Sequence, residues 1–220
     1  HRLILNSRTY RQSSRRSEVS RERDPGNELL AGFPRRRLDA ETLRDTLLAL
    51  GGTLDRTPGM EHPFPPPTDW KFTQHNPFKA VYDTPRRSVY LMTQRIQRHP
   101  FLATFDGADP AGSTPLRLTS TTPVQSLLLL NDPLIHAQAR RFAEQVVASA
   151  PDEDSRIRRA YEVAFGRPPD RDEAESAQRY LSTVAERLRA TGTPDDEVLL
   201  ESWQSLTRVL FRLNEFVYLD

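Results

Sequence analysis

The amino-acid sequence predicts a mainly α-helical protein with a C-terminal helical bundle, a long proline-rich irregular centre and at most one small β element. Three observations lead to this fold class. Beyond residue 122, apolar residues recur at the three- and four-residue spacing of amphipathic helices. Two helix starts in this part place proline directly after a capping residue, at Thr122-Pro123 and Asp132-Pro133. Between residues 58 and 85, prolines are too dense for a helix or a central strand.

We expect one continuous domain with an N-terminal part, residues 1–121, and a bundle, residues 122–220. Residues 1–8 have the pattern of the end of a helix, and residues 11–27 that of a short polar helix or a loop closing in a turn. A helix is predicted over residues 38–50, because Leu43, Leu47 and Leu50 lie at helical spacing before a pair of glycines.

The rest of the N-terminal part is irregular. The proline-rich stretch 58–85 also contains Trp70, Phe72 and Phe78. These aromatic residues favour an ordered loop that wraps the domain, because a low-complexity linker would lack them. Residues 87–93 are rich in β-branched and aromatic side chains and are the best strand candidate. Residues 100–105 are expected to form a short helix that leads into a polar loop.

Five helices are predicted in the bundle, over residues 123–130, 133–149, 153–165, 171–190 and 195–213. Thr122 with Gln125 and Asp170 with Glu173 have the spacing of a capping box, in which side chain and backbone cap each other. Apolar stripes along these helices are interpreted as core, the last of them formed by Leu199, Trp203, Leu206, Leu210 and Leu213.

Composition excludes several kinds of site. Lys+Arg (31) and Asp+Glu (30) nearly cancel, which argues against a general nucleic-acid binder. The absence of cysteine excludes disulfides, thiolate metal sites and covalent c-type haem within this segment. The five histidines lack metal-ligand spacing, and no apolar run approaches the roughly 20 residues of a membrane span. We therefore expect no metal, no cofactor and no membrane span in this segment.

The first candidate site is the charged segment 35–45, with Arg36, Arg37, Asp39 and Glu41. One interpretation is a solvated or interdomain network of ion pairs, since residues four apart on a helix are neighbours. The other is an arginine fork that holds a carboxylate, a sulfate or a sugar, because guanidinium offers paired planar donors. A base role for Asp39 or Glu41 is a third and weaker alternative.

The second candidate lies around Asp106 and Asp109, in a loop that contains glycine and proline. Two carboxylates three residues apart would hold a hard cation or act as an acid–base pair, although loop aspartates often only form local turns. Thr121, Thr122 and Gln125 would line the same pocket, and capping already accounts for the last two. Whether Thr121 and Asn131 face the arginines of 35–37 across a shared pocket is an open question at this stage.

Several motifs in one order resemble a known family. They are Thr9-Tyr10-Arg11-Gln12-Ser13-Ser14, Arg35-Arg36-Arg37-Leu38-Asp39-Ala40-Glu41, Arg86-Arg87-Ser88-Val89-Tyr90, Phe105-Asp106-x-x-Asp109, Thr121-Thr122-Pro123-x-Gln125, Arg159-Ala160-Tyr161-x-x-Ala164-Phe165-Gly166-Arg167-Pro168-Pro169 and Asn214-Glu215-Phe216-x-Tyr218-x-Asp220. Together they resemble the C-terminal domain of unknown function in large planctomycete proteins that also carry a cytochrome c domain. Arg87 joins the candidate pocket residues because it belongs to one of these motifs.

The resemblance implies an exported protein, in the periplasm or at the cell surface, with upstream domains of the same chain as partners. It also implies a haem c in one of those domains and a link to polysaccharide breakdown. It supplies no established catalytic residues. Because the sequence starts inside a helical pattern without Met, we expect its native start and any targeting signal to lie upstream.

Three functional classes follow from these observations. The first is a non-catalytic binding or scaffolding domain, favoured because the sequence has no catalytic motif. The second is the catalytic part of a glycan-acting enzyme, which requires one cleft to contain Arg36, Arg37, Asp39, Asp106 and Asp109. The third, nucleic-acid binding, needs a contiguous positive face that the mixed charges do not favour.

Overall fold

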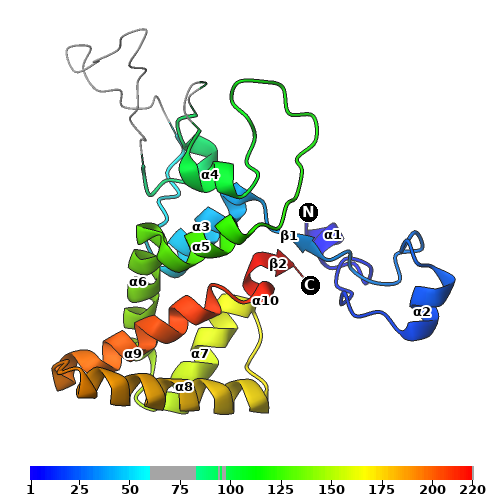
Figure 1. Ribbon diagram of the computed structural model, residues 1–220. Coiled ribbons are helices and arrows are strands. Elements are labelled where there is room, and N and C mark those ends of the chain that lie inside the picture. The colour runs from blue at the N-terminus through cyan, green and yellow to red at the C-terminus, as the bar shows by residue number, and fades with distance from the viewer. Residues whose placement is uncertain (60–82, 94, 96–97, 220) are drawn as a thin grey trace, which may run out of the picture. The chain divides into compact units, whose positions relative to one another are not determined.

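The part of the chain that the structure describes is mainly helical and has one small antiparallel sheet, as the sequence predicts (Figure 1). The structure is a computed structural model that describes residues 1–59, 83–93, 95 and 98–219. Most of the proline-rich stretch, with Trp70, Phe72 and Phe78, lies outside the described residues. Among the described residues, no helix combines the length and the apolar character that crossing a membrane requires.

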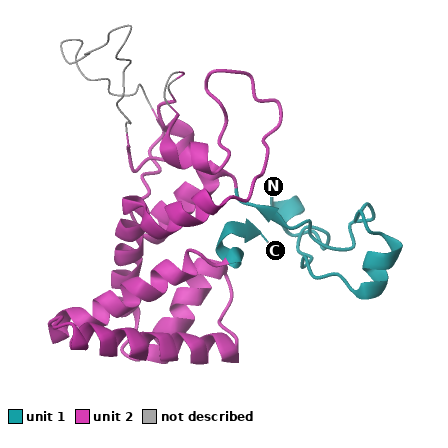
Figure 2. Cartoon of the chain, in the orientation of Figure 1, with its two compact units in different colours: residues 1–38, 214–220 teal, residues 39–213 magenta. Residues whose placement is uncertain are grey.

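The chain divides into two compact units (Figure 2). Unit 1 comprises residues 1–38 and 214–220, and unit 2 comprises residues 39–213. The expected boundary between residues 121 and 122 stays a prediction.

Unit 1 joins the two ends of the chain through its sheet. Its elements are α1 (Arg2–Leu5), α2 (Glu18–Arg23), β1 (Arg36–Arg37), α10 (Asn214–Val217) and β2 (Tyr218–Leu219). The two strands are antiparallel, with Arg36 opposite Leu219 and Arg37 opposite Tyr218. The guanidinium of Arg35 lies 5.0 Å from the ring centre of Tyr218, a cation–π contact that adds to the pairing. The small β element of the fold is therefore here.

Unit 2 begins with α3 (Ala40–Leu50), the helix predicted over 38–50. Asp39 caps it, accepting a hydrogen bond from the Thr42 N–H at 2.7 Å. Its buried face, which includes Leu43 and Leu47, packs against α4 (Pro100–Thr104) and α6 (Pro133–Ser149). Gly51 follows, where a Cβ would clash with the side chain of Gln138.

The strand predicted over residues 87–93 is wrong. Residues Ser88–Tyr90 form a short 3₁₀ helix, η2, and Arg86 makes one isolated parallel bridge with Asp55. A strand needs a neighbour that pairs along its length, whereas the backbone here is bound by side chains of α3. Val89 and Tyr90, which suggested the strand, are exposed.

The helices predicted beyond residue 122 are confirmed: α5 (Pro123–Asn131), α6, α7 (Glu153–Phe165), α8 (Arg171–Ala190) and α9 (Asp195–Leu210). α9 ends three residues earlier than expected, because the chain turns at Phe211, which is buried and stacks on Phe142 with ring centres 5.8 Å apart. The core lies where α9 packs against α6 and α8, and Trp203 in it is 1% exposed.

Candidate functional site

Two adjacent residues of α3, Arg44 and Asp45, hold the segment that precedes η2. Arg44 donates to the carbonyl oxygens of Thr84 at 2.7 Å and Arg86 at 3.3 Å, and to the Ser88 hydroxyl at 3.3 Å. The Ser88 N–H donates to Asp45 Oδ1 at 2.7 Å. Because these groups bind backbone atoms, they fix the path of residues 84–88 and thereby the position of Arg87.

Arg44 is a buried cation, with 2% of its surface exposed. Burial lowers its pKa, because charge is costly to remove from water, and the nearby Asp83 and Asp45 carboxylates oppose that effect. Asp83 lies 3.7 Å from the guanidinium and 2.9 Å from His99 Nε2. The hydrogen bond from His99 lowers the pKa of Asp83, and the charges of His99 and Arg44 lower it further. The buried arginine thus sits beside a carboxylate that favours its ionised form.

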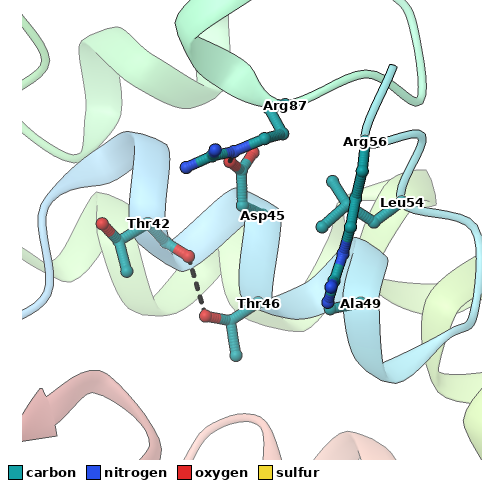
Figure 3. Close-up of a pocket in the computed structure, with 7 residues that line it drawn as sticks. All are labelled: Thr42, Asp45, Thr46, Ala49, Leu54, Arg56 and Arg87. Carbon is teal, nitrogen blue, oxygen red and sulfur yellow. Dashed lines mark hydrogen bonds and ion pairs between the residues drawn. The ribbon is translucent and has the colours of Figure 1, made fainter. Parts of the chain in front are cut away.

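A pocket of about 380 Å³ opens on the neighbouring face of α3 (Figure 3). We call it the α3 pocket. Its walls come from α3 and from the two segments that follow α3 and precede η2. It is lined by Thr42, Asp45, Thr46, Ala49, Leu54, Arg56 and Arg87.

The polar groups of the α3 pocket are arranged around Asp45. Arg87 lies over this carboxylate, with 3.8 Å between Nε and Oδ2, and Arg56 runs alongside α3 towards Ala49 (Figure 3). The Thr46 hydroxyl donates to the Thr42 carbonyl at 2.8 Å, so its oxygen remains an acceptor. The pocket therefore offers two cationic donors, one carboxylate that is already engaged, and threonine oxygens.

A second polar cluster contains three of the predicted residues, Asp106, Thr122 and Gln125. Asp106 accepts hydrogen bonds from the backbone N–H and the hydroxyl of Ser120, each at 2.8 Å. The Gln125 amide donates to the Ser120 hydroxyl at 3.2 Å and to the Thr104 carbonyl at 3.0 Å. Thr122 and Gln125 form the predicted capping box. These bonds close the loop between α4 and α5, which is a structural role.

Other predicted residues make contacts away from the α3 pocket. Glu41 is held by Arg117, which donates through both terminal nitrogens, one of them at 2.8 Å, and this hydrogen bond raises the pKa of Arg117. Asp109 accepts from the Ala111 N–H at 2.9 Å in an exposed turn, and Asn131 donates to the Leu127 carbonyl at 3.0 Å. Thr121 is exposed at the start of α5. None of these residues lines the α3 pocket.

Arg36 and Arg37 belong to β1 in unit 1, whereas the other candidates belong to unit 2. A single cleft that unites Arg36 and Arg37 with Asp39, Asp106 and Asp109 therefore stays a prediction, as does a shared pocket with Thr121 and Asn131.

Sequence reasoning singled out Arg87 and the segment around Asp45, but it missed Thr42, Thr46 and Arg56 as pocket residues. The helical spacing of Thr42, Asp45, Thr46 and Ala49 places them on the face of α3 opposite to its leucines. This pattern in the sequence could have identified them as one surface. Arg56 follows a loop whose path depends on distant contacts, so no local pattern marks it. Among the described residues, no group of three His, Asp or Glu side chains is placed to hold a metal ion.

Comparison with known proteins places the chain in a family. A model described as PSD1, a protein of unknown function (DUF1553), matches residues 1–181, which include all of the α3 pocket. Comparisons with curated proteins and with solved structures found no match.

Proposed function

The chain belongs to the DUF1553 family of proteins of unknown function, and on that premise we propose that it is a non-catalytic accessory domain that binds a polar ligand for a larger exported protein. The α3 pocket is the observation that carries this proposal. It is a concave site of about 380 Å³, within the range of about 300–1,000 Å³ typical of small-molecule sites.

The chemistry of the α3 pocket favours binding over catalysis. Hydrolysis of a glycosidic bond generally needs two carboxyl groups that flank the bond. Asp45 is the one carboxylate among the described residues that line the pocket, and it is engaged by the Ser88 N–H and lies beside Arg87. Backbone N–H groups donate hydrogen bonds to the carboxylates of Asp39, Asp106 and Asp109. The alternative, a catalytic part of a glycan-acting enzyme, would need a second acid from elsewhere in the protein.

We place this domain in an exported, multidomain planctomycete-type protein whose upstream domains include a cytochrome c. The ordered motifs support this assignment, and polysaccharide is the ligand class that it suggests. With no cysteine in the segment, a covalent haem would be held by an upstream domain. Cell fractionation and a haem stain of the intact protein test location and haem content separately. We do not propose nucleic acid as a partner, because the net charge of +1 gives little general attraction to phosphates.

A glycan array and a turnover screen, both on the intact protein, test the central proposal. We expect binding of polysaccharide fragments without release of shorter products. Binding that is unchanged when residues of the α3 pocket are substituted would contradict the assignment of this pocket. Release of products that stops on substitution of Asp45 would instead establish the catalytic alternative.

A further inference from the structure

The α3 pocket carries a positive charge that its own carboxylate does not balance. Among the described residues, two arginines, Arg56 and Arg87, line it together with the single aspartate Asp45. Arg87 pairs with Asp45, with 3.8 Å between Nε and Oδ2. Its side chain is 56% exposed, so part of its guanidinium faces solvent. The described lining residues therefore give the pocket one net positive charge and arginine donors at its surface.

Arg56 has fewer partners than Arg87 among the described residues. Among the described residues, no hydrogen bond or ion pair of its side chain is present. The adjacent carboxylate, Asp55, is already used: its Oδ1 accepts from the Thr57 N–H at 2.8 Å, and its Oδ2 lies 3.6 Å from Arg86 Nε. Hydrogen bonding by the Thr57 side chain, and then by its backbone N–H, is the main cause of the lowered pKa of Asp55. Arg56 is thus a cation whose nearest acid in the sequence has other partners.

The Thr46 hydroxyl is a hydrogen-bond acceptor in the pocket. It donates its proton to the Thr42 carbonyl, so its oxygen can accept a hydrogen bond from a ligand hydroxyl. Ala49 and Leu54 give the pocket small apolar surfaces next to these groups. A ligand that fits must therefore combine an anionic group, hydroxyl groups and some apolar surface.

From this complementarity we infer that the α3 pocket takes an acidic sugar unit, with its carboxylate or sulfate held by Arg56 and Arg87 and a hydroxyl donated to Thr46. This inference rests on the proposed binding function and narrows its ligand from glycans in general to anionic ones. Planar guanidinium groups pair with carboxylate and sulfate oxygens through charge-assisted hydrogen bonds, which are stronger than the bonds a neutral sugar would make.

Calorimetric titration of the intact protein tests the inference with three oligosaccharides of equal length: one of uronic acids, one sulfated and one neutral. We expect an anionic oligosaccharide to bind at least about tenfold more tightly than the neutral one, a ratio that corresponds to about 1.4 kcal/mol. Binding should weaken as salt is raised, because exposed charges are screened. The uronate and sulfate arms show which oxyanion is preferred.

Two variants localise the effect. Arg56→Gln removes the charge from an exposed side chain and should weaken binding of the anionic oligosaccharide by about tenfold or more. Arg140→Gln is the matched control, because Arg140 is also an exposed arginine, on α6, and should leave binding unchanged.

The outcomes separate this inference from the proposed function. Equal binding of neutral and anionic oligosaccharides, or an Arg56→Gln protein that binds as well as wild type, overturns the acidic-sugar inference and leaves glycan binding in place. Failure of the intact protein to bind any of the three overturns both.

Discussion

In helices α6–α9, neighbouring elements meet mainly through apolar side chains, whereas the wall of the α3 pocket is joined to its helix by charged and polar groups. Trp203 and Phe142 are almost fully buried in the helical region. In the pocket wall, the corresponding buried group is the guanidinium of Arg44, bound to backbone carbonyls of residues 84 and 86. Both regions belong to unit 2, and they differ in how a substitution would destabilise them.

Apolar packing is non-directional, so the helices tolerate small shifts and lose stability in proportion to the surface exposed. A buried arginine is directional and costly to desolvate, so its contribution depends on all its acceptors being in place. The pocket wall is therefore specified by a few bonds, and the helices by many contacts. The following predictions, from the largest expected effect to the smallest, test this difference.

Trp203→Ala should have the largest effect, destabilising the protein by about 3–5 kcal/mol, because it leaves a cavity in the core formed by α6, α8 and α9. Chemical denaturation followed by circular dichroism measures the loss. Leu199→Ala is the control, because Leu199 lies on the same helix but is 44% exposed, and it should cost much less. Similar losses for both variants would contradict the assigned core.

Arg44→Ala should cost about 3 kcal/mol, because it removes a buried cation and leaves part-buried carbonyls without their donor. Hydrogen exchange should accelerate first at the Ser88 amide, whose bond to Asp45 lies beside the lost contacts. Arg44→Lys should restore little of the loss, because a single ammonium cannot reproduce the paired planar donors. Acceleration that is uniform over the helices instead would show that Arg44 does not act on the pocket wall specifically.

Thr207→Val should cost about 1 kcal/mol, the usual size for one intramolecular hydrogen bond. The Thr207 hydroxyl is fully buried on α9 and lies 2.9 Å from the Ala139 carbonyl of α6. Valine keeps the shape of the side chain and removes only the polar contact. The midpoint of urea denaturation reports the change, and an unchanged midpoint would mean that this hydroxyl adds no stability to the contact between α6 and α9.

Glu173→Gln should have the smallest effect and should change mainly the pH dependence of stability. The hydrogen bond from Arg167 lowers the pKa of Glu173, so the folded state favours its ionised form. That contribution is complete above the unfolded pKa of about 4.3 and is lost as pH falls through the lower folded value. The variant should lose less stability than wild type over this acid range in thermal melts, and parallel curves would contradict the assignment.

The helices could be predicted from sequence because their determinants are local. Proline after Thr122 and Asp132, the Asp170–Glu173 capping box and the leucine spacing of α3 all lie within a few residues of the structure they specify. The resemblance to a domain of unknown function also came from sequence and is confirmed by the match to residues 1–181, whereas the planctomycete and cytochrome associations stay predictions.

The pocket could be predicted only in part, because its determinants are distant in sequence. Arg44 and the carbonyl of Thr84 are 40 residues apart, and no periodicity connects them. The residues around 89 have the composition of a strand, yet their backbone is bound by side chains, so tertiary contacts override local preference. Arg87 was found through a motif, whereas Arg56 belongs to the pocket only because the loop after α3 brings it there.

The link between Asp106 and Ser120 also makes the loop between α4 and α5 a place where the chain can be lengthened. Asp106 adopts a left-handed backbone, with φ of 59°, and its carboxylate holds the far end of the loop. Once the two ends are fixed, extra residues cost only the entropy of a longer closure, about 0.6 kcal/mol for each doubling of length. The exposed residues 111–115 precede the Arg117 contact with Glu41. A tag or fluorophore inserted among them should therefore leave both anchors in place.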